Sequence, residues 1–134
     1  MRWETSDPSR FNDFVLGRQI LRTEGQDSCR LRMQPRHMNT NTANNVHGGV
    51  ILSLADVAMF AAVYVLRGID AGKSVTVDLA TQFIGAASPA KPLDAIAELL
   101  RETRRLAFLR GLIVQDDAIV ASFSGTIRKP STSA

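Results

Sequence analysis

The longest hydrophobic stretch in the chain runs from Val50 to Leu66 and is interrupted by one acidic residue, Asp56. A helix drawn over this stretch has apolar residues on nearly every side, which is typical of a helix buried in a protein core. His47 ends the polar loop before it, and Gly68 follows it at the position where glycine commonly ends a helix. The pattern therefore predicts a long central helix from about His47 to Gly68.

Shorter apolar runs, separated by turn residues, lie before and after this helix and favour β-strands. The segment LDAIAELLRE also has the Ala, Glu and Leu content of a helix, but Ile96 and the neighbouring hairpin pattern favour a strand. Because the connections between the later runs are short, we expect each strand to pair antiparallel with the next, as a meander. The predicted strands are RQILRTE and SCRLRMQ before the helix, and SVTVDLATQF, LDAIAELLRE, LAFLRGLIVQ and AIVASFSGTIRK after it.

At the N-terminus, Ser6 or Asp7 is expected to cap a short helix that has Pro8 in its first turn and ends at Gly17. One long helix with about five antiparallel strands predicts an α+β fold in which a curved sheet wraps the helix. Such a sheet has edges to cover. We therefore expect two copies to pair edge to edge as a dimer with a continuous sheet.

The chain has 134 residues, 45% of them hydrophobic and 22% charged, which predicts a single domain over residues 1–134. The net charge of +3 comes with scattered Arg residues, so we expect no nucleic-acid partner. Cys29 is the only cysteine, which excludes an internal disulfide and favours the cytoplasm. The N-terminal residues resemble no targeting segment, and Asp56 within the apolar stretch favours a core helix over a membrane span.

Two glycines, Gly48 and Gly49, open the predicted central helix, where backbone amides are unpaired and the helix dipole is positive. This is a suitable place for a developing negative charge. His47 and several asparagines, Asn41 among them, lie just before these amides and could hold a carbonyl oxygen or orient a water. Turn formation or helix capping explains each of these residues equally well when it is taken alone.

Asp56 has no Lys or Arg three or four residues away on the helix. We expect it to be either paired with a distant Arg or hydroxyl group, or a nucleophile or general base in a dry pocket. In the following strand, alternation predicts Thr76 and Asp78 on one face and Val75 and Val77 on the other.

The segment NTANNVHGGVILSLADVA resembles the hotdog-fold acyl-CoA thioesterases of the PaaI-like group, which are related to 4-hydroxybenzoyl-CoA thioesterases. Asn41, His47, Gly48, Gly49 and Asp56 fall at the matching positions of that signature. The segments SVTVDLATQF and RRLAF extend the similarity over most of the chain after the first helix. Asn44 stands where relatives usually have Gly; Asn is the next best residue at positive φ. The connection GAASPAKPLD is longer than usual.

The resemblance implies hydrolysis of an acyl-CoA thioester without metal or cofactor. Its carbonyl would lie on the Gly48 and Gly49 amides, with Gly48 the main donor, and Asp56 would attack it or activate a water. Asn41 would position the water or Asp56, and Thr76 would hydrogen-bond near the carboxylate.

His47 would support the loop and the carbonyl. The basic excess and the turn sequence TRR suggest that Arg104 and Arg105 contact the phosphates of CoA, although a solvated turn is the simpler interpretation. Two other functions stay open: a hotdog hydratase or dehydratase, and an acyl-CoA-binding module without catalysis.

Gly48 and Asp56 are eight residues apart, which separates their backbones by about 12 Å along one helix. One thioester carbonyl group therefore cannot contact both residues of the same helix. We expect the site to be shared between two chains of a homodimer, with a dimer of dimers also open.

Overall fold

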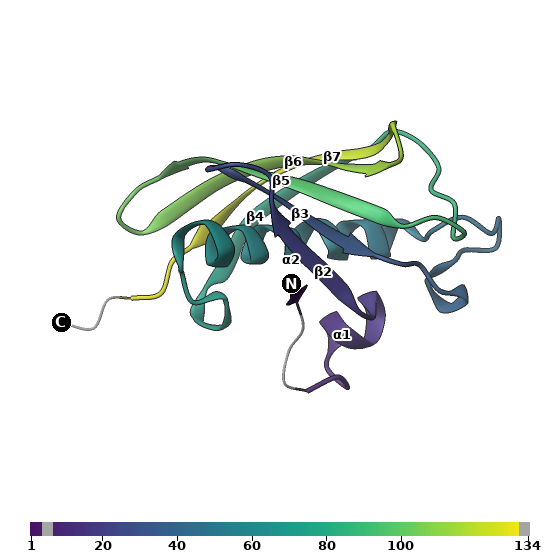
Figure 1. Ribbon diagram of the computed structural model, residues 1–134, viewed down its shortest axis with the longest axis horizontal. Coiled ribbons are helices and arrows are strands. Elements are labelled where there is room, and N and C mark those ends of the chain that lie inside the picture. The colour runs from purple at the N-terminus through teal and green to yellow at the C-terminus, as the bar shows by residue number, and fades with distance from the viewer. Residues whose placement is uncertain (4–6, 132–134) are drawn as a thin grey trace.

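The computed structural model describes residues 1–3 and 7–131 and contains one long helix packed on one face of a seven-stranded antiparallel sheet (Figure 1). The sheet order is β1-β2-β3-β5-β6-β7-β4. Two short 3-10 helices lie at His37–Asn39 and Ala71–Lys73. The predicted α+β architecture is confirmed. The elements are β1 (Arg2–Trp3), α1 (Phe11–Leu16), β2 (Gln19–Thr23), β3 (Ser28–Met33), α2 (Gly48–Arg67), β4 (Val75–Phe83), β5 (Leu93–Glu102), β6 (Leu106–Gln115) and β7 (Ala118–Arg128).

Helix α2 begins and ends where the sequence predicts. His47 is its N-cap, and Gly68 follows it in the left-handed conformation with φ +68°. The Gly68 N–H donates to the Tyr64 carbonyl, which satisfies one of the free carbonyls of the last turn. Both ends are thus fixed by local chemistry that the sequence shows.

Small residues let α2 lie close to the sheet. Gly125 in β7 is required at this contact, because a Cβ there would lie 2.8 Å from the Asp78 carbonyl oxygen and would overlap the Met59 sulfur. Although α2 is long and apolar enough to cross a membrane, more than half of it is buried in this packing, so it is the core helix. The fully buried alanines at the contact are Ala55, Ala58, Ala61 and Ala62 of α2, and Ala95, Ala97, Ala107 and Ala121 of the sheet.

Strand β4 does not pair with β5, so the predicted meander is wrong at this step. Strands β5, β6 and β7 do form a meander, but β5 pairs with β3, and β4 pairs with β7 at the far edge of the sheet. The reason is α2, which follows β3, crosses the sheet and delivers the chain to the opposite edge (Figure 1). Residues 84–92 then lead back to the middle of the sheet.

The N-terminal region also differs from the prediction. Helix α1 begins at Phe11, because the Asp7 carboxylate accepts hydrogen bonds from the Ser9 amide and hydroxyl and forms a turn instead of a cap. The alternative cap, Ser6, lies outside the described residues. The short strand β1 was not predicted; it pairs with β2 and covers that edge of the sheet.

Candidate active site

The loop before α2 is organised by the Asn41 side chain. Its Oδ1 accepts hydrogen bonds from the Ala43 amide at 3.0 Å and the Asn45 amide at 3.1 Å. Asn44 has φ +60°, the conformation that its place in the turn predicts. In the part of the chain that the structure describes, the Asn41 side-chain NH₂ has no hydrogen-bond partner, so it can still donate to a ligand or water.

His47 determines which backbone amide at the helix start is free. Its Nδ1 accepts a hydrogen bond of 2.8 Å from the Gly49 N–H. A neutral imidazole that accepts at Nδ1 carries its proton on Nε2, and this group can donate outward because His47 is exposed. The Gly48 N–H has no partner among residues 1–3 and 7–131. The expected pair of donors is therefore reduced to Gly48, since the Gly49 amide is already engaged.

Asp56 is half-buried and paired with a hydroxyl group, which is one of the two environments that the sequence left open for it. Its Oδ1 accepts a hydrogen bond of 2.7 Å from the Thr76 hydroxyl. Among the described side chains, no Lys, Arg or His forms an ion pair with it. The carboxylate is thus positioned by a neutral hydroxyl group and is accessible to solvent on its other side.

A β-bulge turns Thr76 toward α2. In the ladder between β4 and β7, Thr76 pairs with Ile127 and Asp78 pairs with Thr126, so Val77 is an extra residue. Ile127 is fully buried on the helix side. Thr76 and Asp78 consequently face opposite sides of the sheet, and the prediction that they share a face is wrong. Without the bulge, Thr76 would point away from Asp56.

The described chain forms two separate groups of candidate residues. Asp56 and Thr76 lie together near the beginning of β4. Gly48 lies beside the end of β4, since a Cβ on it would be 3.4 Å from the Phe83 ring. The distance of about 12 Å along α2 keeps the two groups apart within one chain.

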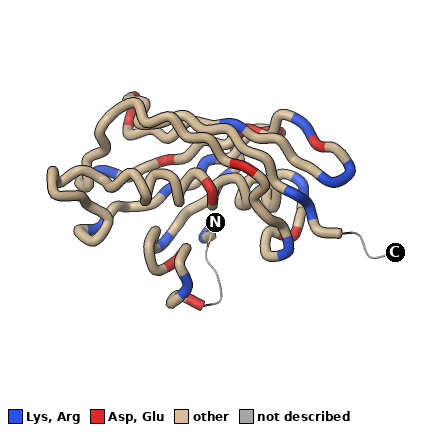
Figure 2. The backbone as a smooth tube through the Cα atoms, turned by 180° about the vertical axis from the view of Figure 1, so that it is seen from behind, with Lys and Arg blue, Asp and Glu red and all other residues tan. Residues whose placement is uncertain are grey.

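Arg104 and Arg105 lie in the exposed turn between β5 and β6, at the C-terminal end of α2. Arg67, the last residue of α2, forms a salt bridge of 3.1 Å with Glu102 at this end of the sheet. Figure 2 shows basic residues gathered in this region. Because α2 has 20 residues and is therefore about 30 Å long, the two arginines lie far from the Gly48 of their own chain.

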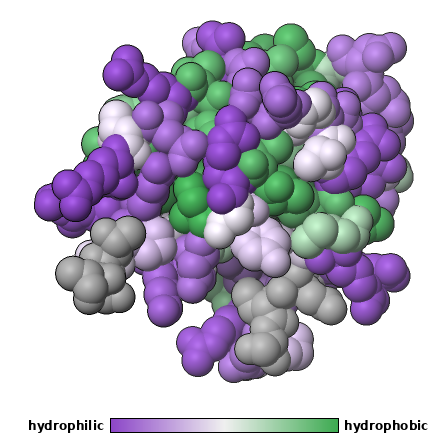
Figure 3. Space-filling model, turned by 60° about the vertical axis from the view of Figure 1, so that its left-hand side comes forward, coloured by the Kyte–Doolittle hydropathy of each residue, from purple (hydrophilic) through white to green (hydrophobic). Residues whose placement is uncertain are grey.

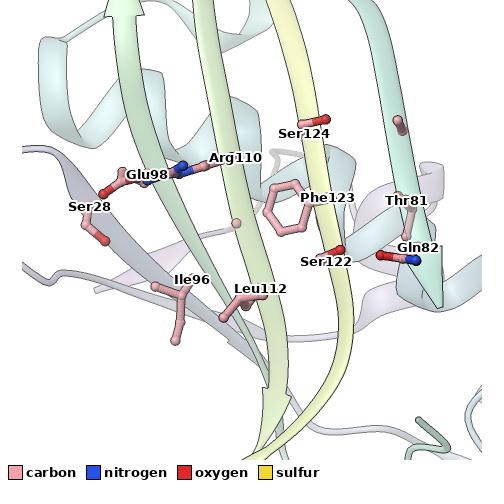
Figure 4. Close-up of a pocket in the computed structure, with 12 residues that line it drawn as sticks. Ser28, Thr81, Gln82, Ile96, Glu98, Arg110, Leu112, Ser122, Phe123 and Ser124 are labelled. Carbon is pink, nitrogen blue, oxygen red and sulfur yellow. The ribbon is translucent and has the colours of Figure 1, made fainter. Parts of the chain in front are cut away.

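Two cavities were not predicted from the sequence, because their walls combine residues from distant segments. The larger, of about 870 Å³, lies on the face of the sheet away from α2, between side chains such as Ile96, Leu112 and Ser122 (Figure 4). No candidate catalytic residue lines it. The smaller, of about 290 Å³, lies beside α2 and is lined by Trp3, Asn12, Val57, Phe60, Ala71, Gly72 and Ser74.

The described residues contain no group of three or more His, Cys, Asp or Glu side chains that could hold a metal ion. Cys29 is fully buried in the core, and burial raises the pKa of its thiol to about 11. A thiol with so high a pKa is a poor nucleophile at neutral pH. The Cys29 side chain is therefore part of the packed core.

Solved structures share this fold at low sequence identity. The PaaI protein of the Escherichia coli phenylacetic acid degradation operon is 21% identical, with a TM-score of 0.77 over 89% of this chain and 83% of that chain. A putative esterase from Mycobacterium tuberculosis is 24% identical, with a TM-score of 0.77 over 91% and 98%. Mouse thioesterase superfamily member 2 is 20% identical, with a TM-score of 0.74 over 87% and 85%.

No curated protein sequence matches the chain. The family model of the thioesterase superfamily matches residues 43–122, which include the helix-start loop from Ala43 on but not Asn41, all of α2, the Thr76 bulge and the central strands. This span is more than half of the chain. Together with the helix-on-sheet architecture and its structural neighbours, the match shows that the protein is a hotdog-fold member of the thioesterase superfamily.

Proposed function

We propose that this protein is an acyl-CoA thioesterase that hydrolyses the thioester to a free acid and CoA. The observation that carries the proposal is Asp56, a carboxylate in the middle of the core helix that no cation of the described residues neutralises and that the Thr76 hydroxyl holds in place. The free Gly48 amide at the positive end of α2 supplies the second requirement, a donor for the oxyanion. Family membership supports the reaction type.

The site is completed by a second copy of the chain, which pairs along β4. This strand pairs only with β7 among the described strands, and its side chains Val75, Val77 and Phe83 are each more than half exposed. A long edge strand that exposes apolar side chains tends to pair with a strand of another chain. Figure 3 shows hydrophobic side chains gathered at the centre of one face of the molecule, surrounded by hydrophilic ones.

The length of β4 determines which residues such a dimer would bring together. Leu79 is the middle of the strand Val75–Phe83, so an antiparallel pair related by a two-fold axis near Leu79 places Thr76 of one protomer near the end of β4 of its partner. Gly48 lies beside that end, against Phe83. The dimer thus joins Asp56 and Thr76 of one protomer to the helix start of the other. It also places the Arg104–Arg105 turn of the first protomer at that same end.

In the proposed reaction, the thioester carbonyl oxygen accepts a hydrogen bond from the Gly48 N–H, which stabilises the negative charge that develops there. Asp56 of the other protomer either attacks the carbonyl carbon, forming an acyl–Asp anhydride that a water then hydrolyses, or removes a proton from a water that attacks the carbon directly. In both routes the carbon–sulfur bond breaks, and the CoA thiolate takes up a proton that the water gives up. The free NH₂ of Asn41 is available to hold the water, and His47 can donate from Nε2.

The test is the turnover of purified protein with acetyl-, hexanoyl-, palmitoyl- and phenylacetyl-CoA, measured as release of free thiol. We expect Asp56→Asn to lose a hundredfold or more in kcat, because it removes the nucleophile or base. The variant should fold normally, since the Asn oxygen can still accept from Thr76. Asp117→Asn in the exposed β6–β7 turn is the control and should keep full activity.

Near-normal turnover of Asp56→Asn would exclude Asp56 as the catalytic group. Tight binding of acyl-CoA without any release of thiol by the wild type would favour the binding module instead. Hydration of an enoyl-CoA without hydrolysis would favour the hydratase.

A further inference from the structure

The cavity of about 290 Å³ is lined by neighbours of Asp56 and of its partner Thr76, although neither of these two residues lines it. Val57, which lines it, directly follows Asp56 in the chain, and Phe60 lies one helical turn further on, within about 6 Å between Cβ atoms. Ser74, on the opposite wall, is two residues before Thr76, which bonds Asp56. The cavity therefore begins about one helical turn from the carboxylate, on the side toward the C-terminal end of α2.

The walls of this cavity are mainly apolar and are held by packing. Trp3 is fixed through the pairing of β1 with β2 and through contact with Tyr64, their ring centroids being 5.3 Å apart. Val57 is nearly fully buried, and Phe60 packs against the core. A pocket with preformed apolar walls favours burial of a hydrocarbon group by about 0.8 kcal/mol for each methylene.

The volume limits the size of that group. An apolar protein cavity of about 150 Å³ accommodates one benzene molecule. The cavity here has about twice that volume. It therefore holds a single ring with a short chain, or a straight chain of about eight carbons, and is too small for a long-chain fatty acyl group.

One polar group of the cavity is not used by the protein. Asn12 in α1 lines it and is half-buried, and within residues 1–3 and 7–131 its carboxamide has no hydrogen-bond partner. The Ser74 hydroxyl, by contrast, donates to the Asp70 carbonyl. An unpaired amide on an apolar wall can bind a hydroxyl or carbonyl group on the ligand.

We propose that this cavity is the acyl pocket, with Phe60 and Ala71 setting the length of the acyl group and Asn12 binding a polar substituent on it. The proposal rests on the proposed thioesterase function and narrows it to compact acyl groups. The thioester carbonyl would lie at Asp56, and the acyl group would run along α2 past Phe60. The CoA part of the bound substrate would extend on the side of the partner's helix start.

Two variants change the volume of the cavity in opposite directions. Ala71→Phe adds a ring from the short 3-10 helix, and Phe60→Ala removes one from α2. In an acyl-CoA series from acetyl to palmitoyl, the wild type should have its highest kcat/KM near hexanoyl or octanoyl. Ala71→Phe should lower kcat/KM for these two at least tenfold while leaving acetyl-CoA within about twofold, since one methylene in a tight pocket changes kcat/KM by about tenfold or more.

Phe60→Ala should shift the highest kcat/KM of the acyl-CoA series to longer acyl chains. The matched controls are Ala118→Phe at the exposed β6–β7 turn and Phe108→Ala on the half-buried part of β6, and neither should move it. A wild type that prefers palmitoyl-CoA, or an optimum that neither cavity variant moves, would overturn the proposal.

S-hexyl-CoA and S-hexadecyl-CoA are thioethers that cannot be hydrolysed. Their binding tests whether the cavity holds the acyl group, independently of catalysis. Calorimetry should show that the wild type binds S-hexyl-CoA more tightly than S-hexadecyl-CoA. Ala71→Phe should bind S-hexyl-CoA at least tenfold more weakly than the wild type does. If the wild type prefers S-hexyl-CoA but releases no thiol from any acyl-CoA, the proposed thioesterase function is wrong, whereas the assignment of the acyl pocket is supported. Equal Kd values for S-hexyl-CoA in the wild type and Ala71→Phe would overturn the pocket.

Asn12→Leu tests the polar part of the proposal. It should lower kcat/KM for 6-hydroxyhexanoyl-CoA relative to hexanoyl-CoA by about fivefold to tenfold, the effect of one hydrogen bond of about 1 kcal/mol. An unchanged ratio would remove Asn12 from the pocket.

Discussion

At the start of α2, the orientation of the His47 ring controls the chemistry of two neighbouring amides. By accepting from Gly49, His47 caps the helix and leaves the Gly48 N–H directed at solvent. A Cβ at position 49 would lie 3.0 Å from Nδ1, so a larger residue there would disturb this cap. The Gly49 amide thus serves the cap, whereas the Gly48 amide is the one that the proposed reaction assigns to the substrate. The sequence motif alone does not distinguish these two roles.

The hydroxyl group of Thr76 is expected to contribute to catalysis through Asp56. Thr76→Val keeps the β-branched shape that the strand favours but removes the hydrogen bond to Oδ1. Because a hydrogen bond to a charged group contributes about 1.5 kcal/mol, kcat should fall about tenfold, whereas Thr76→Ser should restore most of it. Steady-state hydrolysis of the preferred acyl-CoA measures both.

Thr81→Val is the matched control for Thr76→Val. It makes the same substitution on the same strand, and the Thr81 hydroxyl is buried without a partner in the described chain. Its loss should leave kcat unchanged and should not lower the melting temperature. If Thr81→Val and Thr76→Val reduce kcat equally, the effect belongs to the strand and not to the hydrogen bond with Asp56.

At the level of elements, the sequence predicted what local chemistry determines. The bounds of α2 follow from His47, Gly68 and the apolar run between them, and the six strands β2 to β7 follow from apolar runs bounded by turns. The edge position of β4 could not be predicted, because it depends on where α2 delivers the chain. The bulge at Val77 also has no local signal, since neither Gly nor Pro marks it.

The same limit applies to the candidate site. Asp56 was recognisable as a charge in an apolar helix, and Thr76 by the resemblance of its strand to that of the hotdog thioesterases. Their contact depends on the bulge, and the cavity beside them depends on β1, α1 and α2 meeting in space. Residues such as Trp3 and Asn12 carry no motif and become candidates only in three dimensions.

A cluster of three charged residues links β3 to β5 and is expected to stabilise the fold. The Asp94 carboxylate is 5% exposed and accepts hydrogen bonds of 2.7 Å from both Arg30 and Arg32. Burial raises the pKa of this carboxyl, but the two guanidinium groups more than offset it, so its pKa lies below the ordinary value of 3.8. Asp94→Asn should lower the free energy of unfolding by about 2 kcal/mol at pH 7, because it leaves two arginines without their anion.

The pH dependence of that loss has a definite sign. A carboxyl whose pKa is lower in the folded state stabilises the protein above its unfolded pKa, and this stabilisation is lost as the pH falls through the folded value. The difference between wild type and Asp94→Asn in urea unfolding should thus be full above about pH 5 and should shrink below pH 4. Asp117→Asn, at an exposed position, should show no such gap. A gap that persists unchanged at pH 2.5 would mean that packing, and not charge, explains the loss.

On the scale of the whole molecule, the position of Arg104 and Arg105 makes sense only in the proposed dimer, where they lie near the partner's helix start. Changing both to Gln should raise KM for acyl-CoA about tenfold and leave KM for the matching acyl-pantetheine unchanged, since only CoA carries the nucleotide phosphates. Arg18→Gln with Arg22→Gln removes the same charge from the residue before β2 and from β2 itself, and is the control. Equal effects on both substrates would show damage to the fold instead of a lost phosphate contact.

The shared site makes a prediction that a single-chain site cannot satisfy. Asp56 lies with Thr76 near one end of β4, and Gly48 with the Asn41 loop lies near the other, so each protomer of the proposed dimer supplies one half to each of two sites. Asn41→Ala removes both acceptor bonds that order the helix-start loop, and Asp56→Ala removes the carboxylate. Each homodimer should therefore be nearly inactive, because both of its sites carry a defect.

In a mixed dimer of Asn41→Ala and Asp56→Ala protomers, one site receives both defects and the other receives none. Co-expression with two different affinity tags, followed by purification on both, isolates this mixed dimer. Its activity per dimer should be about half that of the wild type, because one of its two sites is intact. The control is a dimer that carries Asp56→Ala in both protomers and a different tag on each. It should stay inactive, which excludes an effect of the tags. If the Asn41→Ala and Asp56→Ala mixed dimer is as inactive as its parents, Asp56 and the helix start act within one chain, and the pairing along β4 does not build the site.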